Sequence, residues 1–342
     1  MNPCIVYLAQ NTSKDLQYGR DSRSMLEESL DLLFENYNDQ FGHDVLIFHE
    51  GDFDPISQKE IARGRKEIKF HTLKFELPDF LNPSEIPDKW DGIFGMGYRH
   101  MMRFYSLTIF DFLKNQGYDW FIRMDDDSFI HSKIDYNLFE FMAENGFEYG
   151  YRVITKEPER TSHGFSEMIL AYIKAERIKP HTFLENFDAS AKLNNEAFSM
   201  KGKIKRKVLS VIDYMATKLN HDLNNWPEPR EWNRWTFYTN FLITRIDFWL
   251  RPDVQSLLHH FDRVGGGYKY RWGDHILQTA VTQIFLPESK VYKFVDWTYE
   301  HATVKNGKLD WGGIYPGKDD EANPAVIDFE KKYGIRKLNS SF

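Results

Sequence analysis

The chain has 342 residues and a slight excess of acidic groups, with 44 Lys+Arg against 51 Asp+Glu and a net charge of −7. This balance, without a long basic block, argues against a nucleic-acid-binding surface. Hydrophobic residues make up 42% of the chain, which supplies a substantial core and excludes intrinsic disorder. Aromatic residues reach 16%, which fits either an aromatic-rich core or platforms that hold flat ligands and sugars.

No segment has the roughly 20 apolar residues that a membrane span needs. The longest apolar run, at 237–250, is interrupted by Asn240, Arg245 and Asp247. The N-terminus lacks the pattern of a signal peptide, and a lone cysteine, Cys4, suits a reducing compartment. We therefore expect a cytoplasmic protein, with a lumenal domain cut from a longer chain as the alternative.

The first part of the chain predicts a βαβ unit. A buried strand at 4–9 precedes an amphipathic helix at 21–37 and a second strand at 44–49. A third strand follows at 68–73, and then come a helix at 98–116 and a strand at 120–124. Strands alternating with helices favour a parallel sheet, so residues 1–130 are typical of a nucleotide-binding α/β half.

The second half, residues 131–305, mixes both kinds of element within the same domain. The pattern predicts helices at 139–144, 166–176, 248–261 and 272–284, and strands at 146–153, 237–244 and 291–295. The segment 194–233 carries a basic run and predicts a solvated helical insertion or lid, or else a membrane-surface or phosphate-binding patch. From residue 297 the chain is predicted to be rich in loops, and residues 306–342 form a C-terminal extension.

Three consecutive aspartates follow the predicted strand at 120–124. In open α/β sheets, ligands bind where strands end, and Asp125 and Asp127 can converge on one hard cation if the backbone turns there. A bound Mg²⁺ or Mn²⁺ takes oxygen ligands and neutralises a diphosphate. An Asp-x-Asp at this place is typical of nucleotide-sugar transferases, and an ordinary acidic turn is the alternative.

Two further positions are candidates for the same site. Asp274 follows a run of three glycines and the pair Arg271 and Trp272, which suits a sugar site, although Asp also caps helices. His301 follows a strand-like run, and its imidazole is either a ligand to a transition metal or a structural group.

The predicted helix at 98–116 carries cations and phenols at helical spacing. Arg99 and Arg103 share one face, as do Tyr98 and Tyr105 about two turns apart. This set suits a diphosphate-sugar, and it equally suits surface pairing.

Five sequence blocks occur in a distinctive order, at 97–106, 123–127, 240–249, 266–274 and 299–301. They include Gly-Tyr-Arg-His-Met, Arg-x-Asp-x-Asp, Gly-Gly-x-Tyr-x-x-Arg-Trp-Gly-Asp and Tyr-x-His. Together they closely resemble glycosyltransferase family 15, the fungal-type α-1,2-mannosyltransferases of the Golgi. The resemblance covers roughly residues 3–305.

The resemblance implies a single GT-A domain, with a Rossmann-like mixed sheet, Mn²⁺ (or Mg²⁺) and GDP-mannose as donor. The family has Glu-Pro-Asp at 125–127, so the metal role carries over to Asp125 and Asp127, joined by His301. It implies Asp274 as the base or orienting group for the acceptor hydroxyl. The remaining expected site residues are, for the donor, Tyr98, Arg99, Arg103, Asp125 and Arg271, and for catalysis, Tyr105 and Asn240.

One position departs from the family. A glutamate in the family's Ser-Asn-Phe-Glu-Ile, the candidate nucleophile, is replaced here by Leu242. Leucine cannot attack an anomeric carbon, so a covalent intermediate through this position is excluded. Retention of configuration then requires front-side attack or another carboxylate, and the change also fits a different sugar donor.

The expected function is therefore a metal-dependent, retaining transfer of mannose from GDP-mannose to a hydroxyl of a glycan or glycoprotein, with an α-1,2 linkage. One alternative is a transferase of the same fold that uses a UDP-sugar. The other is a catalytically silent glycan-binding module. The sequence does not indicate an oligomeric state.

Overall fold

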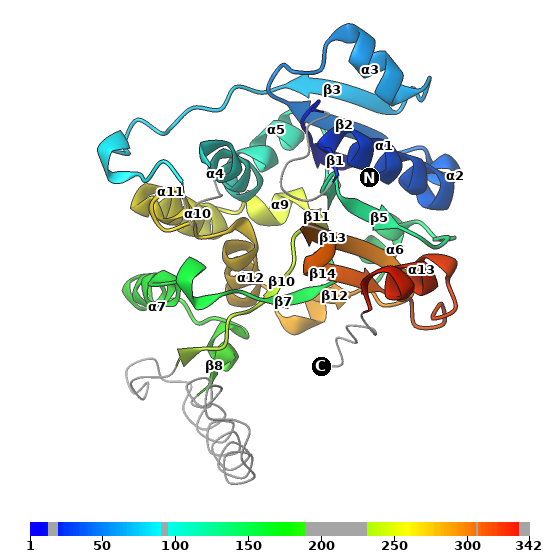
Figure 1. Cartoon of the computed structure of the whole chain (residues 1–342). Coiled ribbons are helices and arrows are strands. Elements are labelled where there is room, and N and C mark those ends of the chain that lie inside the picture. The colour runs from blue at the N-terminus through cyan, green and yellow to red at the C-terminus, as the bar shows by residue number, and fades with distance from the viewer. Residues whose placement is uncertain (13–19, 90–94, 189–230, 306, 335–342) are drawn as a thin grey trace.

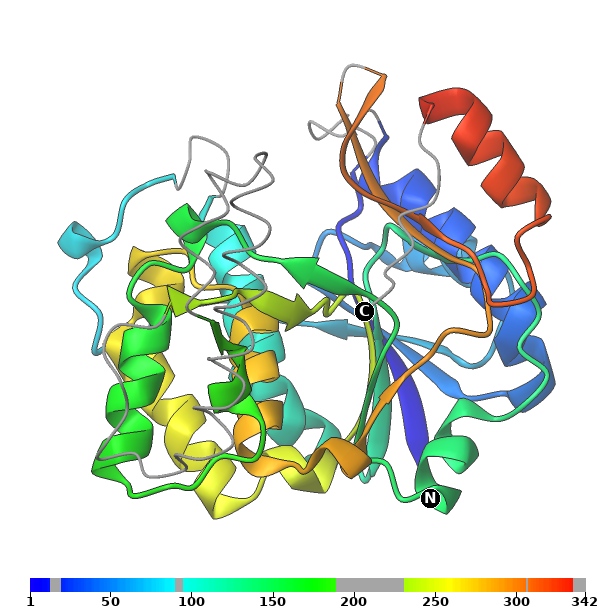
Figure 2. The same cartoon turned by 90° about the horizontal axis from the view of Figure 1, so that it is seen from below.

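The computed structural model describes residues 1–12, 20–89, 95–188, 231–305 and 307–334. A mixed sheet forms the centre of the molecule, and helices cover both of its faces, as the expected α/β class requires (Figures 1 and 2). Within these residues, no helix has the length and apolar character to span a bilayer.

The central sheet has seven strands in the order β12-β6-β11-β4-β1-β2-β3. All neighbours pair in parallel except at β11, which is antiparallel to both β4 and β6. Several strands are continuous apolar runs because helices cover both faces. Their bounds are β1 (Pro3–Leu8), β2 (Asp44–His49), β3 (Ile68–Thr72), β4 (Trp120–Met124), β6 (Tyr149–Tyr151), β11 (Phe241–Arg245) and β12 (Val291–Lys293).

One face of the sheet packs against the N-terminal helix. Asp21 caps that helix by accepting a hydrogen bond from the Ser24 backbone at 2.8 Å, which fixes where the helix begins. Gly42, at φ 64°, ends the last turn. The elements on this face of the sheet are α1 (Ser22–Leu33), the π-helical turn η1 (Phe34–Asn38), α2 (Asp39–Phe41), α3 (Pro55–Ala62) and α6 (Leu138–Glu144).

The other face packs against a larger group of helices, which Figure 2 shows on the opposite side of the sheet from α1. These are α4 (Met96–Arg103), the π-helical turn η3 (Phe104–Thr108), α5 (Ile109–Asn115), α7 (Phe165–Ala175), α9 (Ile246–Trp249), α10 (Pro252–Val264), α11 (Gly266–Lys269) and α12 (Asp274–Phe285). Short 3₁₀ turns are η2 (Pro83–Glu85), η4 (Glu159–Thr161), η5 (Phe183–Asn186) and η8 (Glu288–Lys290).

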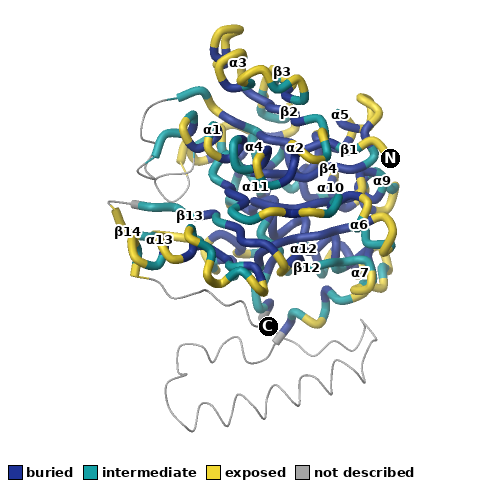
Figure 3. The backbone as a smooth tube through the Cα atoms, turned by 90° about the vertical axis from the view of Figure 1, so that its right-hand side faces the viewer, coloured by how far each residue is buried: buried dark blue, intermediate teal, exposed yellow. Residues whose placement is uncertain are grey.

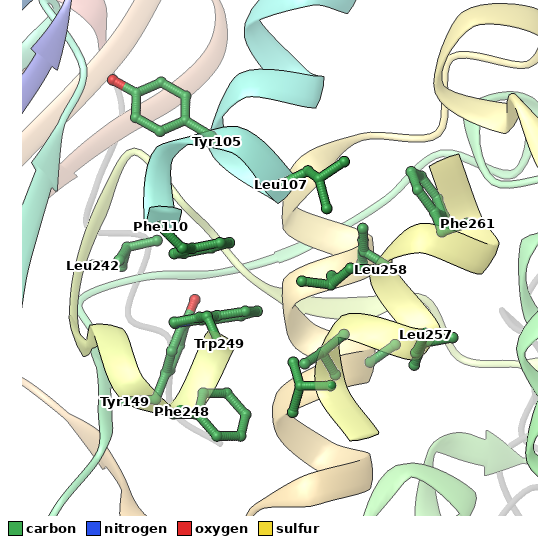
Figure 4. Packing of buried hydrophobic residues seen from close by; sticks show 14 of the residues in the cluster. Tyr105, Leu107, Phe110, Tyr149, Leu242, Phe248, Trp249, Leu257, Leu258 and Phe261 are labelled. Carbon is green, nitrogen blue, oxygen red and sulfur yellow. The ribbon is translucent and has the colours of Figure 1, made fainter. Parts of the chain in front are cut away.

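The core on this second face is largely aromatic. The rings of Phe110 and Trp249 stack with centroids 4.8 Å apart, and Leu242 and Tyr149 lie beside them (Figure 4). Burial is continuous through the central strands, whereas α3 and α13 (Pro324–Tyr333) carry most of their exposure on their outer sides (Figure 3). The abundance of aromatic residues therefore serves the core to a large extent.

The described part of the chain has three further, smaller sheets besides the central one. One pairs β7 (Ile154–Lys156) with β10 (Trp235–Phe237), and another pairs β8 (Phe187–Asp188) with β9 (Glu231–Trp232). The third has the order β14-β13-β5, formed by β5 (Ser128–Ile130), β13 (Tyr299–Lys305) and β14 (Lys308–Tyr315).

Two predicted elements are each divided in the structure. The strand expected at 237–244 is two strands, because β10 pairs with β7 and only β11 enters the central sheet. The helix expected at 248–261 is α9 and α10, because Pro252 lacks an N–H and begins a new helix.

The prediction of a loop-rich C-terminal region was wrong. The chain forms the hairpin β13–β14 and then α13, whose first turn is capped by Asn323. The sequence between the two strands contains Asn-Gly at 306–307, a pair typical of tight hairpins. The helix α3 was not predicted either. The predicted insertion at 194–233 lies outside the described residues except at its end, where β9 begins.

Candidate active site

The triple-aspartate segment forms a tight turn between β4 and β5. The Ser128 backbone N–H donates to the Asp125 carbonyl at 3.1 Å, which closes the turn. The Asp125 N–H and the Ser128 hydroxyl both donate to the carbonyl of Asn240, each at 3.1 Å. The crossing between β10 and β11 therefore holds this turn at the end of the central sheet.

His301 reaches the turn through strand pairing. β13 is antiparallel to β5, and the register places His301 opposite Ser128. Its Nε2 lies 3.1 Å from Oδ1 of Asp127. One ligand atom from each of Asp125, Asp127 and His301 lies within 4.8 Å of the other two. The structure thus brings together the three residues that the sequence predicted as metal ligands.

Three carboxyl groups lie close together in this cluster, and their pKa values are shifted in different directions. Burial and the neighbouring carboxylates raise the pKa of Asp126 well above its ordinary value, and burial likewise raises the pKa of Asp125. Burial alone would raise the pKa of Asp127, but the adjacent His301 lowers it overall. Two carboxylates and an imidazole are donors that suit Mn²⁺, and Nδ1 of His301 is buried without a partner among the described residues. This donor set fits a divalent cation.

Arg123 connects the cluster to Asp274. The guanidinium is buried over the ring of Tyr105, with 3.7 Å from Cζ to the ring centroid. Its Nε donates to Asp125 at 2.9 Å, and its Nη1 donates to Asp274. Tyr105, which was predicted as catalytic, therefore packs with its ring face against the guanidinium of Arg123.

Asp274 is almost fully enclosed. Besides Arg123, it accepts a hydrogen bond from the Thr239 hydroxyl at 2.8 Å. Burial alone would raise the pKa of its carboxyl, but Arg123 and the other partners lower it overall. The residue before it, Gly273, occupies the N-cap position of α12, so Asp274 is not the cap. The partners of Asp274 favour the orienting role over that of a base.

A second polar cluster lies beside the first. The buried carboxylate of Glu157 accepts from Arg271 Nη1 at 3.0 Å and contacts His275 Nε2 at 2.7 Å. Arg271 also donates to the Tyr98 hydroxyl at 3.0 Å, so two predicted donor-binding residues do meet. Burial alone would raise the pKa of Glu157, but His275 and Arg271 lower it overall.

Glu157 and His275 were not predicted as site residues. His275 directly follows Asp274 in the sequence, which is a usable signal because both residues belong to the first turn of α12. Glu157 follows β7 and precedes a proline, and nothing in its local sequence indicates a site.

Tyr238 links the two clusters. Its ring packs edge-on against His301 at a centroid distance of 5.1 Å and against His275 at 6.3 Å. Tyr238, Thr239 and Asn240 occupy the crossing from β10 to β11, so one break between strands supplies three neighbouring groups.

Asn240 itself has an unusual environment. It is 1% exposed, yet neither amide atom of its side chain has a hydrogen-bond partner within the described parts of the chain. A buried amide costs free energy unless its polar atoms are paired, which indicates that a ligand or water completes its bonding.

Arg99 and Arg103 do share a face of α4, as the spacing predicted, but their observed partners lie elsewhere. Arg103 forms a two-bond ion pair with Asp262 of α10, at 2.8 and 2.9 Å. Arg99 is buried and donates to the Pro87 carbonyl at 2.6 Å. Their role in donor binding stays a prediction, and the contact with Asp262 speaks against it for Arg103.

Leu242 is fully buried on β11. In the antiparallel register it lies opposite Arg123, and its side chain belongs to the apolar cluster with Phe110 and Trp249 (Figure 4). The residue that departs from the family pattern is therefore a core residue in this chain.

A mixed sheet covered by helices, with a carboxylate pair at the end of a central strand, is the arrangement of a glycosyltransferase of the GT-A type. The chain belongs to the glycolipid 2-alpha-mannosyltransferase family, whose sequence model matches residues 1–311.

Similar curated proteins are yeast mannosyltransferases. Alpha-1,2 mannosyltransferase KTR1 of Saccharomyces cerevisiae is 24% identical over 297 residues, which cover 83% of this chain and 67% of KTR1. O-glycoside alpha-1,2-mannosyltransferase homolog 4 of Schizosaccharomyces pombe is 24% identical and covers 89% of this chain and 70% of the relative. The match to the glycolipid 2-alpha-mannosyltransferase of S. cerevisiae, also 24% identical, covers 90% of this chain and 62% of the relative.

Solved structures show the same fold. The Mn/GDP form of core-mannan synthase A (CmsA/Ktr4) from Aspergillus fumigatus superposes with a TM-score of 0.67 at 18% identity, covering 88% of this chain and 74% of that one. The mannosyltransferase Ktr4p from S. cerevisiae in complex with GDP gives 0.66 at 19% identity, covering 92% and 73%.

Proposed function

We propose that this protein transfers mannose from GDP-mannose to a hydroxyl of a glycan, with retention of configuration and an α-1,2 linkage. The observation that carries the proposal is the convergence of Asp125, Asp127 and His301 at the end of β4. The proposal is supported by the names of the relatives, which are alpha-1,2-mannosyltransferases, and by the solved Mn/GDP form of a related fold.

The three clustered residues would hold Mn²⁺ (or Mg²⁺), and that ion supplies charge neutralisation for the diphosphate leaving group. Arg123 holds the carboxylate of Asp125 in place and orients Asp274 through the same guanidinium. The amide of Asn240, which has no partner in the described part of the chain, can both donate to and accept from a sugar hydroxyl. Because Arg123 holds both Asp125 and Asp274, these carboxylates are organised before the substrate arrives.

Retention follows a front-side route in this proposal. Leu242 offers no carboxylate, so no protein–sugar bond forms at that position. The acceptor oxygen bonds to the anomeric carbon as the bond from that carbon to the diphosphate oxygen breaks. The proton of the acceptor hydroxyl passes to the departing diphosphate, so charge and atoms balance. Positioning of the two substrates then provides most of the rate.

The test is calorimetric titration of GDP, with and without Mn²⁺, into wild-type protein and into Asp127→Asn. We expect Mn²⁺ to strengthen GDP binding to the wild type at least tenfold and to have little effect on the variant. Asp310→Asn, at an exposed acid on β14, is the matched control and should behave as wild type. GDP binding that ignores Mn²⁺ in the wild type would contradict the metal role.

The same titration, repeated with UDP and with a glycan in place of GDP, separates the two alternative functions. Preference for UDP over GDP identifies a transferase of the same fold with another donor. Glycan affinity that depends on neither nucleotide nor metal identifies the silent binding module, which the loss of the family glutamate at position 242 makes worth testing.

A further inference from the structure

An open hollow of about 500 Å³ lies outside the cluster of Glu157 and Arg271. Four exposed side chains line it, those of Glu159, Arg160, His163 and Tyr270. Its volume falls in the range of small-molecule sites. None of these four residues belongs to the predicted site.

Two chain segments carry residues of both the hollow and the Glu157 cluster. Glu159 lies two residues after the buried Glu157, and Tyr270 directly precedes Arg271, the ion-pair partner of Glu157. The indole N–H of Trp272 donates to the His163 carbonyl at 2.8 Å, which joins the two segments. The hollow and the Glu157 cluster are therefore built on the same two segments.

The backbone that carries Tyr270 is held in place by the packing of Trp272. The indole of Trp272 lies directly on Gly266, where an added Cβ would come within 1.9 Å of the ring, so this loop closes only with glycine there. The rings of Tyr270 and Trp272 pack at 5.5 Å, and Tyr270 remains 46% exposed. An exposed aromatic ring on a well-anchored loop is a contact surface of low entropic cost.

The chemistry of the lining favours a neutral, polyhydroxylated ligand. One carboxylate, one guanidinium and one imidazole surround the hollow, so it lacks the excess of positive charge that a diphosphate needs. A single aromatic ring offers too little apolar area for a hydrophobic peptide. The C–H face of a pyranose can pack on the Tyr270 ring while its hydroxyl groups bond to the charged groups at the rim.

We propose that this hollow is a second acceptor subsite, which binds the sugar adjacent to the one that receives the mannose. This inference rests on the proposed function, because it places the reacting sugar beside Glu157 and Arg271. It makes the protein selective for acceptors of at least two sugar units.

The test compares the binding of α-1,2-mannobiose and methyl α-mannoside by calorimetry in the presence of Mn²⁺ and GDP. The wild type should bind the disaccharide at least fivefold more tightly than the monosaccharide, and Tyr270→Ala should remove most of this preference. Tyr270→Phe keeps the ring and should retain the preference. Phe80→Ala, at another exposed aromatic residue, is the matched control.

Each result decides between separate claims. An equal preference in wild type and Tyr270→Ala would overturn the subsite, and so would a wild type without preference for the disaccharide. Disaccharide preference that disappears in Tyr270→Ala would support the subsite even if the titrations with GDP and Mn²⁺ failed. Those two results together would reject GDP-mannose as the donor and leave the acceptor subsite standing.

Discussion

Leu242 is one residue at which the sequence is expected to depart from the family pattern. The side chain lies in the aromatic core, opposite Arg123 on the neighbouring strand, and Arg123 finds its carboxylate partners in Asp125 and Asp274. The basic group therefore keeps acidic neighbours although the family glutamate is absent.

We predict that substitutions of Leu242 change stability and leave the chemistry intact. Leu242→Met conserves volume and should cost less than about 1.5 kcal/mol, whereas Leu242→Ala should cost about 2–5 kcal/mol. Transfer per folded molecule should stay within a few-fold of wild type in both. Urea unfolding and initial-rate measurements check this. A Leu242→Met protein of normal stability without transfer would show that position 242 does take part.

Local sequence patterns predicted only some of the site residues. Asp125, Asp127 and His301 lie in recognisable sequence blocks, and the structure brings these three residues together. Glu157 is different, because its importance arises from contacts with Arg271 and His275, more than a hundred residues later in the chain. No local pattern contains such a relation, since it depends on how distant segments pack.

At the level of elements, the C-terminal hairpin determines where His301 lies. Arg152, at the end of β6, anchors this hairpin to the central sheet. Its guanidinium donates to the carbonyls of Trp297, Tyr315 and Pro316 at distances between 2.9 and 3.1 Å. Burial lowers the pKa of Arg152 to about 10, which leaves it protonated near neutral pH.

We predict that Arg152→Met destabilises the protein by about 3 kcal/mol or more, because three carbonyls lose their donor. The affinity for Mn²⁺ should fall as well, since His301 loses its support. Urea unfolding and metal titration measure the two effects. Arg245→Met, at an exposed arginine, should change stability by no more than about 0.5 kcal/mol. Equal stability of the two variants would contradict the anchoring role.

Element prediction succeeded where one pattern ran without interruption. β2 and β4 match their predicted ranges because each is a short buried apolar run. The run at 237–244 was misread because burial continues across the crossing from β10 to β11, while hydrogen bonding changes partner there. Hydrophobicity reports burial and does not report which strand is the neighbour.

At the scale of the whole molecule, stability should depend on pH through a half-buried histidine, His43. The ring of His43 packs against Phe139 and Phe41, and burial lowers its pKa from 6.5 to about 4. The unfolded chain therefore takes up a proton first as the pH falls, so this contribution to stability is complete above about pH 6.5 and is lost toward pH 4.

We expect the free energy of unfolding of His43→Gln to fall less steeply than that of the wild type between pH 6.5 and 4. Urea unfolding at several pH values measures the slope. His259→Gln, at an exposed histidine, should keep the slope of the wild type. Parallel slopes for wild type and His43→Gln would refute the assignment.

The α/β class and the parallel pairing of the first four strands of the central sheet followed from alternation along the sequence. The places of β6, β11 and β12 in the sheet did not follow, because β11 runs antiparallel and enters the sheet from a distant segment. Local periodicity carries no information about such long-range pairing.

The strand β13 has one more consequence, which concerns synthesis. Two of the proposed cation ligands, Asp125 and Asp127, leave the ribosome well before the third, His301, which lies much later in the sequence. A nascent chain can build its first parallel strands well before it has a complete coordination set. The proposed coordination set should therefore be completed only when β13 docks against β5.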